Sequence, residues 1–103
     1  MAGAIVTAVE GVVPAKRVSD LLDTFPAGDL PPFILATSLA KEVGSDRWRV
    51  VTIWRSRQEL DAYVASVDTP AALAAFRAAG VEPELTFWEA DRVLFSPSGE
   101  ATE

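Results

Sequence analysis

Hydrophobic and polar positions change their period along the chain, and these changes divide the first 95 residues into strands and helices. Runs of β-branched and other apolar residues without a helical repeat indicate strands. Apolar residues three and four positions apart indicate amphipathic helices. The pattern predicts four strands, at Ala4–Val13, Phe33–Val43, Arg47–Trp54 and Glu84–Phe95.

The first helical pattern follows the first strand directly. Pro14 fits the first turn of a helix, where its missing N–H costs nothing. One apolar face then follows at helical spacing, formed by Val18, Leu21, Leu22 and Phe25. Pro26, Gly28 and the pair Pro31-Pro32 are expected to end this helix and to form a loop.

The second helical pattern begins with Ser56 and Glu59, an S-x-x-E capping box worth on the order of 1 kcal/mol. Its apolar face continues with Leu60, Tyr63, Val64 and Val67. Asp68-Thr69-Pro70 breaks the helix and restarts it, with Thr69 as the expected cap and Pro70 as the first helical residue. The restarted helix is expected to stop at Gly80.

The element order βαββαβ predicts a ferredoxin-like α+β fold, in which a four-stranded antiparallel sheet carries both helices on one face. Apolar residues occupy both faces of these strands, so the uncovered face is expected to pack against a second copy. The result would be a homodimer in the form of an α/β barrel. Residues 1–95 are expected to form a single domain, followed by a flexible polar tail at 96–103.

Composition narrows the chemistry that this chain can perform. The sequence contains no cysteine and no histidine, which argues against disulfides, thiol catalysis, imidazole-based triads and most metal sites. The net charge is −6 and the basic residues are scattered, which argues against nucleic-acid binding. No apolar run approaches the roughly 20 residues that cross a bilayer, and the N-terminus lacks a signal-peptide pattern. A cytoplasmic protein without a membrane or nucleic-acid partner is expected.

The stretch "VVTIWRSRQELDAYVAS", Val50 to Ser66, resembles a W-x-S-x-x-x-(Leu/Phe) stretch of the antibiotic biosynthesis monooxygenase (ABM) family of dimeric α/β barrels. The matching positions are Trp54, Ser56, Glu59, Leu60 and Ser66. The βαββαβ order extends the resemblance over residues 4 to 95. Family members include cofactor-independent oxygenases of phenols and quinols, and haem-degrading enzymes. The resemblance implies a homodimer with a pocket between the sheet and the helices of each subunit.

The sequence also departs from this family at several positions. Tyr63 stands where many oxygenase-type members carry a histidine and the haem-degrading branch carries a tryptophan. That branch also uses a first-strand asparagine and a later helical histidine that binds the haem iron. This chain contains neither residue type and offers Phe76 and Arg77 in the later helical segment. The departures argue against haem degradation by the familiar route, and no cofactor is expected.

Each candidate site residue has a functional and a structural interpretation. Tyr63 is the candidate catalytic residue, through a hydrogen bond or proton transfer to a phenolic substrate, or it is a core or dimer-contact tyrosine. Trp54 is a pocket wall or packs under the second helix. Thr52 and Val50 share its strand face, and the Thr52 hydroxyl could orient a ligand. Further pocket candidates are Phe76 and Arg77, where Arg77 either counters a substrate oxyanion or is solvated. Phe87 and Trp88 lie on opposite strand faces, and one of them is expected to meet the dimer partner.

Two functions remain open from the sequence. The first is an ABM-like cofactor-independent monooxygenase that acts on a small aromatic or quinol-type molecule. The second is a non-catalytic dimer of the same fold that binds a small molecule or only dimerises. A cleft of roughly 300 Å³ or more that reaches Tyr63 would favour the enzyme, and a filled interior would favour the second function. A weaker third idea is a tetrapyrrole bound without a histidine ligand.

Overall fold

A computed structural model of the chain describes residues 3–25 and 28–94. The predicted tail at 96–103 and the predicted strand end at Phe95 lie outside the described residues. The elements are β1 (Ile5–Val12), a short 3₁₀ helix η1 (Ala15–Arg17), α1 (Val18–Thr24), β2 (Ile34–Lys41), β3 (Arg47–Trp54), α2 (Arg57–Ser66), α3 (Ala71–Ala78) and β4 (Glu84–Glu89).

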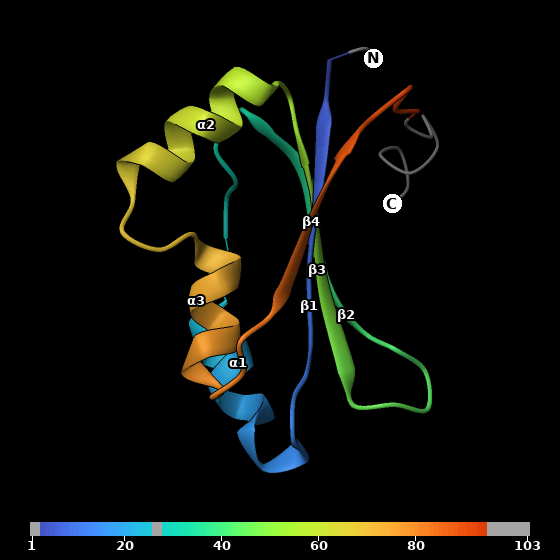
Figure 1. Ribbon diagram of the computed structural model, residues 1–103, viewed down its shortest axis with the longest axis vertical. Coiled ribbons are helices and arrows are strands. Elements are labelled where there is room, and N and C mark those ends of the chain that lie inside the picture. The colour runs from blue at the N-terminus through green and yellow to red at the C-terminus, as the bar shows by residue number, and fades with distance from the viewer. Residues whose placement is uncertain (1–2, 26–27, 95–103) are drawn as a thin grey trace.

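The four strands form one antiparallel sheet in the order β2-β3-β1-β4. The described helices all lie on one side of this sheet, as Figure 1 shows with the sheet nearly edge-on. This arrangement confirms the predicted ferredoxin-like α+β fold. The other face of the sheet, called the open face below, is not covered by any described element. Within the described ranges no helix is long and apolar enough to span a bilayer.

The ends of several elements depart from the sequence prediction. Pro70 is the residue before α3 rather than its first helical residue, and its ψ of 144° is extended, so the predicted Thr69 cap is wrong. The first helix is split, because η1 precedes α1 and Pro14 stands before η1. The cap at Ser56 is confirmed: its Oγ accepts a hydrogen bond of 3.2 Å from the backbone N–H of Glu59.

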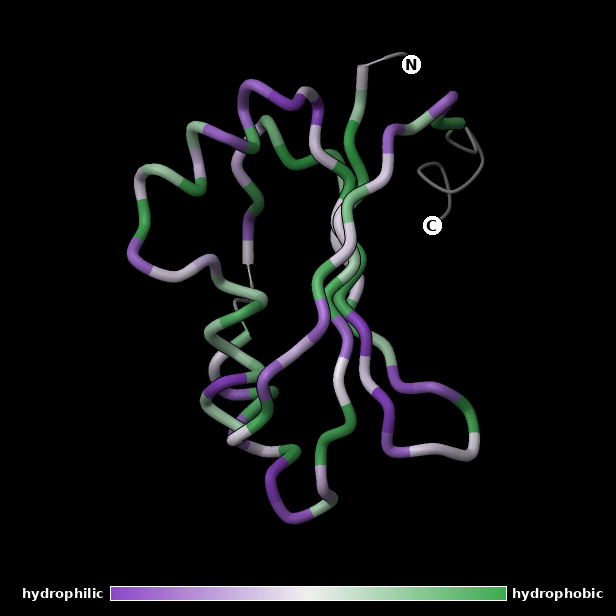
Figure 2. The backbone as a smooth tube through the Cα atoms, in the orientation of Figure 1, coloured by the Kyte–Doolittle hydropathy of each residue, from purple (hydrophilic) through white to green (hydrophobic). Residues whose placement is uncertain are grey.

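Two separate clusters of buried side chains fill the space between the sheet and the helices. The larger cluster lies under α1 and α3 and contains Val9, Leu21, Val50 and Phe76. The smaller cluster lies at the other end of the sheet, where Ile5 on β1 and Trp54 on β3 pack against Leu60 of α2. Figure 2 shows hydrophobic segments where the strands pass one another and along α3.

Two glycines fix the position of α3 against the sheet. A Cβ atom on Gly11 in β1 would lie 2.8 Å from Val81 Cγ1 and 3.3 Å from Phe76 Cδ1. Only a residue without a side chain therefore allows Phe76 to pack this closely on the strand. Gly80 has a φ of +77° and follows α3, which confirms the predicted helix stop.

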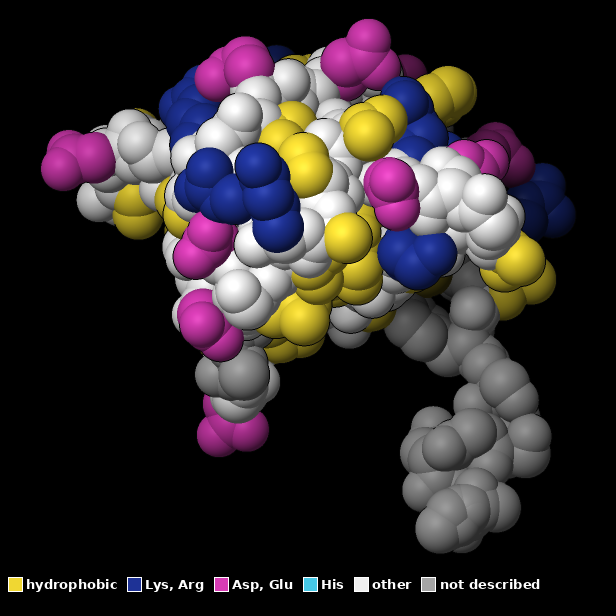
Figure 3. All heavy atoms as spheres, turned by 90° about the horizontal axis from the view of Figure 1, so that it is seen from below, with side chains coloured by type: hydrophobic (Ala, Val, Ile, Leu, Met, Phe, Trp, Pro, Cys, Tyr) yellow, Lys and Arg dark blue, Asp and Glu magenta, His cyan; other side chains and the backbone are white. Residues whose placement is uncertain are grey.

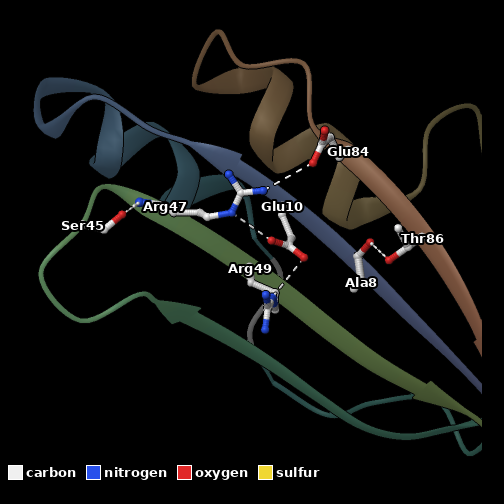
Figure 4. A network of polar contacts seen from close by, with 7 residues as sticks. All are labelled: Ala8, Glu10, Ser45, Arg47, Arg49, Glu84 and Thr86. Carbon is white, nitrogen blue, oxygen red and sulfur yellow. Dashed lines mark hydrogen bonds and ion pairs between the residues drawn. The ribbon is translucent and has the colours of Figure 1, made fainter.

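A network of charged side chains crosses three strands on the open face (Figure 4). Glu10 on β1 contacts the Nε atoms of Arg47 at 3.0 Å and Arg49 at 3.2 Å, and Arg47 also contacts Glu84 on β4 at 3.3 Å. The hydrogen bond from Arg47, followed by that from Arg49, lowers the pKa of the Glu10 carboxyl.

Figure 3 shows the lower end of the molecule, where acidic and basic side chains are interspersed around apolar ones.

We predict that the Glu10 network makes the fold sensitive to acid. Because the folded-state pKa of Glu10 is lowered, its stabilising effect is present above the ordinary glutamate pKa of about 4.3 and is lost as the pH falls through the lowered value. Glu10→Gln should lower the urea midpoint at pH 7, with a smaller further decrease below pH 4 than in the wild type. Glu89→Gln is the control, and equal midpoints for Glu10→Gln and wild type at pH 7 would contradict this role.

Candidate functional site

A cavity of about 210 Å³ lies between the helical face of the sheet and helices α2 and α3. It separates the two buried clusters, since its lining includes Val9 and Val50 from the larger one and Trp54 and Leu60 from the smaller one. An apolar protein cavity of roughly 150 Å³ holds benzene, so one substituted ring fits here. The volume is below the roughly 300 Å³ of a typical drug-sized ligand site. The interior is therefore not filled, but it suits only a small molecule.

Trp54 at the end of β3 serves both as packing and as cavity wall. Its side chain is buried and its ring is stacked on Phe33 at a centroid distance of 6.2 Å and tilted against Tyr63 at 5.2 Å. The indole Nε1 donates a hydrogen bond of 3.0 Å to Thr7 Oγ1 on β1. A buried indole N–H needs such an acceptor, so Thr7 fixes the orientation of the cavity wall.

Tyr63 projects from α2 into the cavity wall, and its hydroxyl also connects the two helices. The Tyr63 hydroxyl oxygen accepts a hydrogen bond of 3.1 Å from the backbone N–H of Ala71, the first residue of α3. The first N–H groups of a helix lack partners within it, and Pro70 offers no side-chain cap. Tyr63 thus takes over the capping role. Its own O–H hydrogen remains able to donate.

The structure brings together four of the six residues predicted from the sequence. Val50 and Thr52 on β3 line the cavity with Trp54 and Tyr63. Phe76 does not line it: its side chain is fully buried in the larger cluster, against Gly11. Arg77 is also outside the cavity. Its guanidinium is exposed and donates two hydrogen bonds, of 3.1 and 2.9 Å, to the Glu82 carboxylate, which raises the pKa of Arg77.

Sequence reasoning missed a row of threonines on the cavity floor. The strand register places Thr37 opposite Thr52, and Thr52 opposite Thr7, with Phe87 next in the row. All four residues line the cavity. The Thr37 and Thr52 hydroxyl oxygens are 2.9 Å apart and share one hydrogen bond. Alternation along each strand gives the face of a threonine, whereas the row depends on how the strands pair.

Charge is nearly absent from the cavity lining. Among the described lining residues only Asp29 is charged, and it lies exposed in the loop before β2. Within the described ranges no three acidic side chains gather in a way that could hold a metal ion. The groups that the site offers a ligand are therefore aromatic rings, aliphatic side chains and uncharged hydroxyls.

Comparisons with solved structures identify proteins of the same fold. A candidate antibiotic biosynthesis monooxygenase from Deinococcus radiodurans matches with a TM-score of 0.65 at 11% identity, over 89% of this chain and 97% of that one. A candidate antibiotic biosynthesis monooxygenase from Caulobacter crescentus matches with a TM-score of 0.56 at 20% identity, over 88% and 92%. SnoaB, a cofactor-independent oxygenase from Streptomyces nogalater, matches with a TM-score of 0.54 at 15% identity, over 90% and 98%.

The protein has the fold of the antibiotic biosynthesis monooxygenases. The resemblance of the Val50–Ser66 stretch to this family is therefore confirmed at the level of the fold. No protein-family model matches the sequence, and no curated protein matches it. At identities of 11–20%, what these structures share with this chain is the fold.

We predict that Tyr63→Phe destabilises the protein by about 1 kcal/mol, because the Ala71 N–H loses its acceptor while the ring keeps its packing. Amide hydrogen exchange at Ala71 and in the first turn of α3 should accelerate. Urea unfolding and exchange measured by NMR give both quantities. Ser66→Ala removes an exposed hydrogen bond from the same helix and should change stability by less than about 0.5 kcal/mol. Unchanged exchange at Ala71 in Tyr63→Phe would show that the hydroxyl does not cap α3.

Proposed function

We propose that this protein is a cofactor-independent monooxygenase that acts on a small aromatic or quinol-type molecule in the cavity between the sheet and helices α2 and α3. The observation that carries the proposal is an unfilled apolar cavity, lined by Trp54, Tyr63 and three threonines, inside a fold shared with SnoaB. SnoaB is described as a cofactor-independent oxygenase, and its likeness to this chain supports the reaction class without naming a substrate.

Such a reaction requires little from the protein beyond binding, exclusion of water and help with a proton. An electron-rich ring with an oxidisable CH₂ group can take one oxygen atom from O₂ to form a carbonyl, while the second oxygen leaves as water. The substrate supplies all the electrons, so no external reductant is needed. Trp54 and Phe87 would hold the ring, and the free O–H of Tyr63 would hydrogen-bond to a substrate oxygen as charge develops on it.

The test is oxygen consumption by purified protein with a panel of single-ring quinols and phenols, matched in size to the cavity of about 210 Å³. We expect at least one compound to be oxidised faster than in buffer, and Tyr63→Phe to reduce that rate by roughly tenfold or more. Arg77→Gln is the matched control, because Arg77 lies outside the cavity and should leave the rate unchanged. A panel without any rate above buffer would contradict the enzymatic proposal.

The alternative is a non-catalytic small-molecule-binding or dimerisation protein of the same fold. It is favoured by the absence of histidine and asparagine from the whole sequence and by a cavity below the usual ligand-site volume. Saturable binding of aromatic molecules without oxygen consumption would support small-molecule binding over catalysis.

We also propose that a second copy of the chain covers the open face of the sheet. Its apolar half carries Val6, Val51, Ile53 and Trp88, and Trp88 is 60% exposed. Removing the apolar surface that these side chains still expose favours assembly, by about 25 cal/mol per Å². All six residues of β4 are exposed in the isolated chain. Phe87 faces the cavity, so Trp88 is the aromatic residue of β4 that would meet the partner.

Light scattering at micromolar protein should give twice the chain mass of 11.0 kDa. Trp88→Glu places a charge in the proposed contact and should shift the protein towards the single-chain mass. Val43→Glu is the control, because Val43 is 98% exposed in the turn between β2 and β3 and is not among the open-face residues. A wild-type species at 11.0 kDa would contradict the dimer.

A further inference from the structure

The cavity floor carries its polar groups in one line across the sheet. Thr37, Thr52 and Thr7 occupy neighbouring positions on β2, β3 and β1, where opposed side chains of paired strands lie about 5 Å apart. Thr7 and Thr52 are only 6% and 7% exposed. Three hydroxyls thus face a space that is otherwise lined mostly by hydrocarbon and aromatic rings.

The hydroxyl hydrogens of the row determine what it can offer a ligand. Each threonine has one O–H donor and two acceptor lone pairs. Thr37 and Thr52 share one hydrogen bond, which uses one of their two hydrogens. Thr7 accepts from the Trp54 indole and keeps its own hydrogen, with no acceptor for it among the described side chains. The row therefore retains two O–H donors and several lone pairs, and an oxygen atom that can accept is the natural partner for both donors.

The lining also defines which oxygen is tolerated. Among the described lining residues there is no lysine and no arginine, and the one charged group is the acidic Asp29. An ionised carboxylate brought onto this floor would lose its hydration without gaining a cation. A phenolic hydroxyl or a carbonyl carries no net charge and needs only the hydrogen bonds that threonines provide.

We infer that the row of Thr37, Thr52 and Thr7 is the polar anchor of the cavity, and that it selects a small aromatic ligand with an uncharged oxygen while rejecting carboxylates. The inference deepens the proposed function and rests on it only in that the cavity must bind a ring. It applies whether or not the bound ring is then oxidised.

The experiment compares three para-methyl benzenes that differ in one group: para-xylene, para-cresol and para-toluate. Binding to the isotope-labelled full chain is followed at pH 7 through the amide NMR signals of cavity-lining residues. We expect para-cresol to bind about 2- to 10-fold more tightly than para-xylene, which matches one net hydrogen bond. Para-toluate should bind at least tenfold more weakly than para-cresol.

The deciding variant is Thr37→Val with Thr52→Val, which removes two hydroxyls at nearly constant volume and leaves the Thr7–Trp54 bond in place. The advantage of para-cresol over para-xylene should shrink, because one of the two free O–H donors of the row is lost and only that of Thr7 remains, while the affinity for para-xylene stays unchanged. Thr86→Val is the control, because Thr86 lies on β4 with its hydroxyl on the open face and should not alter binding.

Three results would overturn the inference, and they differ in what else they affect. If the para-cresol advantage is undiminished in the double variant, Thr37 and Thr52 are not part of the anchor, although the cavity remains a ligand site. If para-toluate binds as well as para-cresol, the floor does not discriminate by charge. If none of the three rings binds, both the anchor and the proposed function are wrong.

Discussion

The break between α2 and α3, closed by the hydrogen bond from Ala71 N–H to the Tyr63 hydroxyl, is the feature on which the site depends. A helix of ten residues spans about 15 Å and one of eight about 12 Å, whereas an eight-residue strand spans about 26 Å. Each helix therefore covers one part of the sheet. Between α2 and α3 a strip of the sheet is not fully covered, and the cavity lies over this strip.

Local contacts hold each of the two helices, α2 and α3, against the sheet. Gly11 allows Phe76 of α3 to pack directly on β1, which fixes α3 against the sheet. The aromatic rings of Phe33, Trp54 and Tyr63 pack together and fix α2 against the sheet. Thr7 accepts a hydrogen bond from the Trp54 indole and holds it in place. Because both helices are fixed in this way, closing the cavity would require one of the two packed clusters to rearrange. Packed clusters resist such rearrangement, so the cavity is a built feature of the fold.

How much the sequence predicted follows from the range of each interaction. Local signals were sufficient for the cap at Ser56, the stop at Gly80 and the strand face that carries Val50, Thr52 and Trp54. Phe76 needed more, since helical period shows that it faces inward but not whether it meets core or cavity. That outcome is decided by Gly11, which is distant in sequence. The threonine row likewise depends on strand register, and the Tyr63–Ala71 bond depends on the path of the chain between two helices.

A crystal structure of the protein soaked with para-cresol tests the central claim, that the space between the sheet and helices α2 and α3 is a preformed site for a small ring. The ring should lie between Trp54 and Phe87, with its oxygen within hydrogen-bonding distance of the Thr52 or Thr7 hydroxyl and with α2 and α3 unmoved. A cavity closed by contact between the two helices, or a ring bound elsewhere on the molecule, would contradict it.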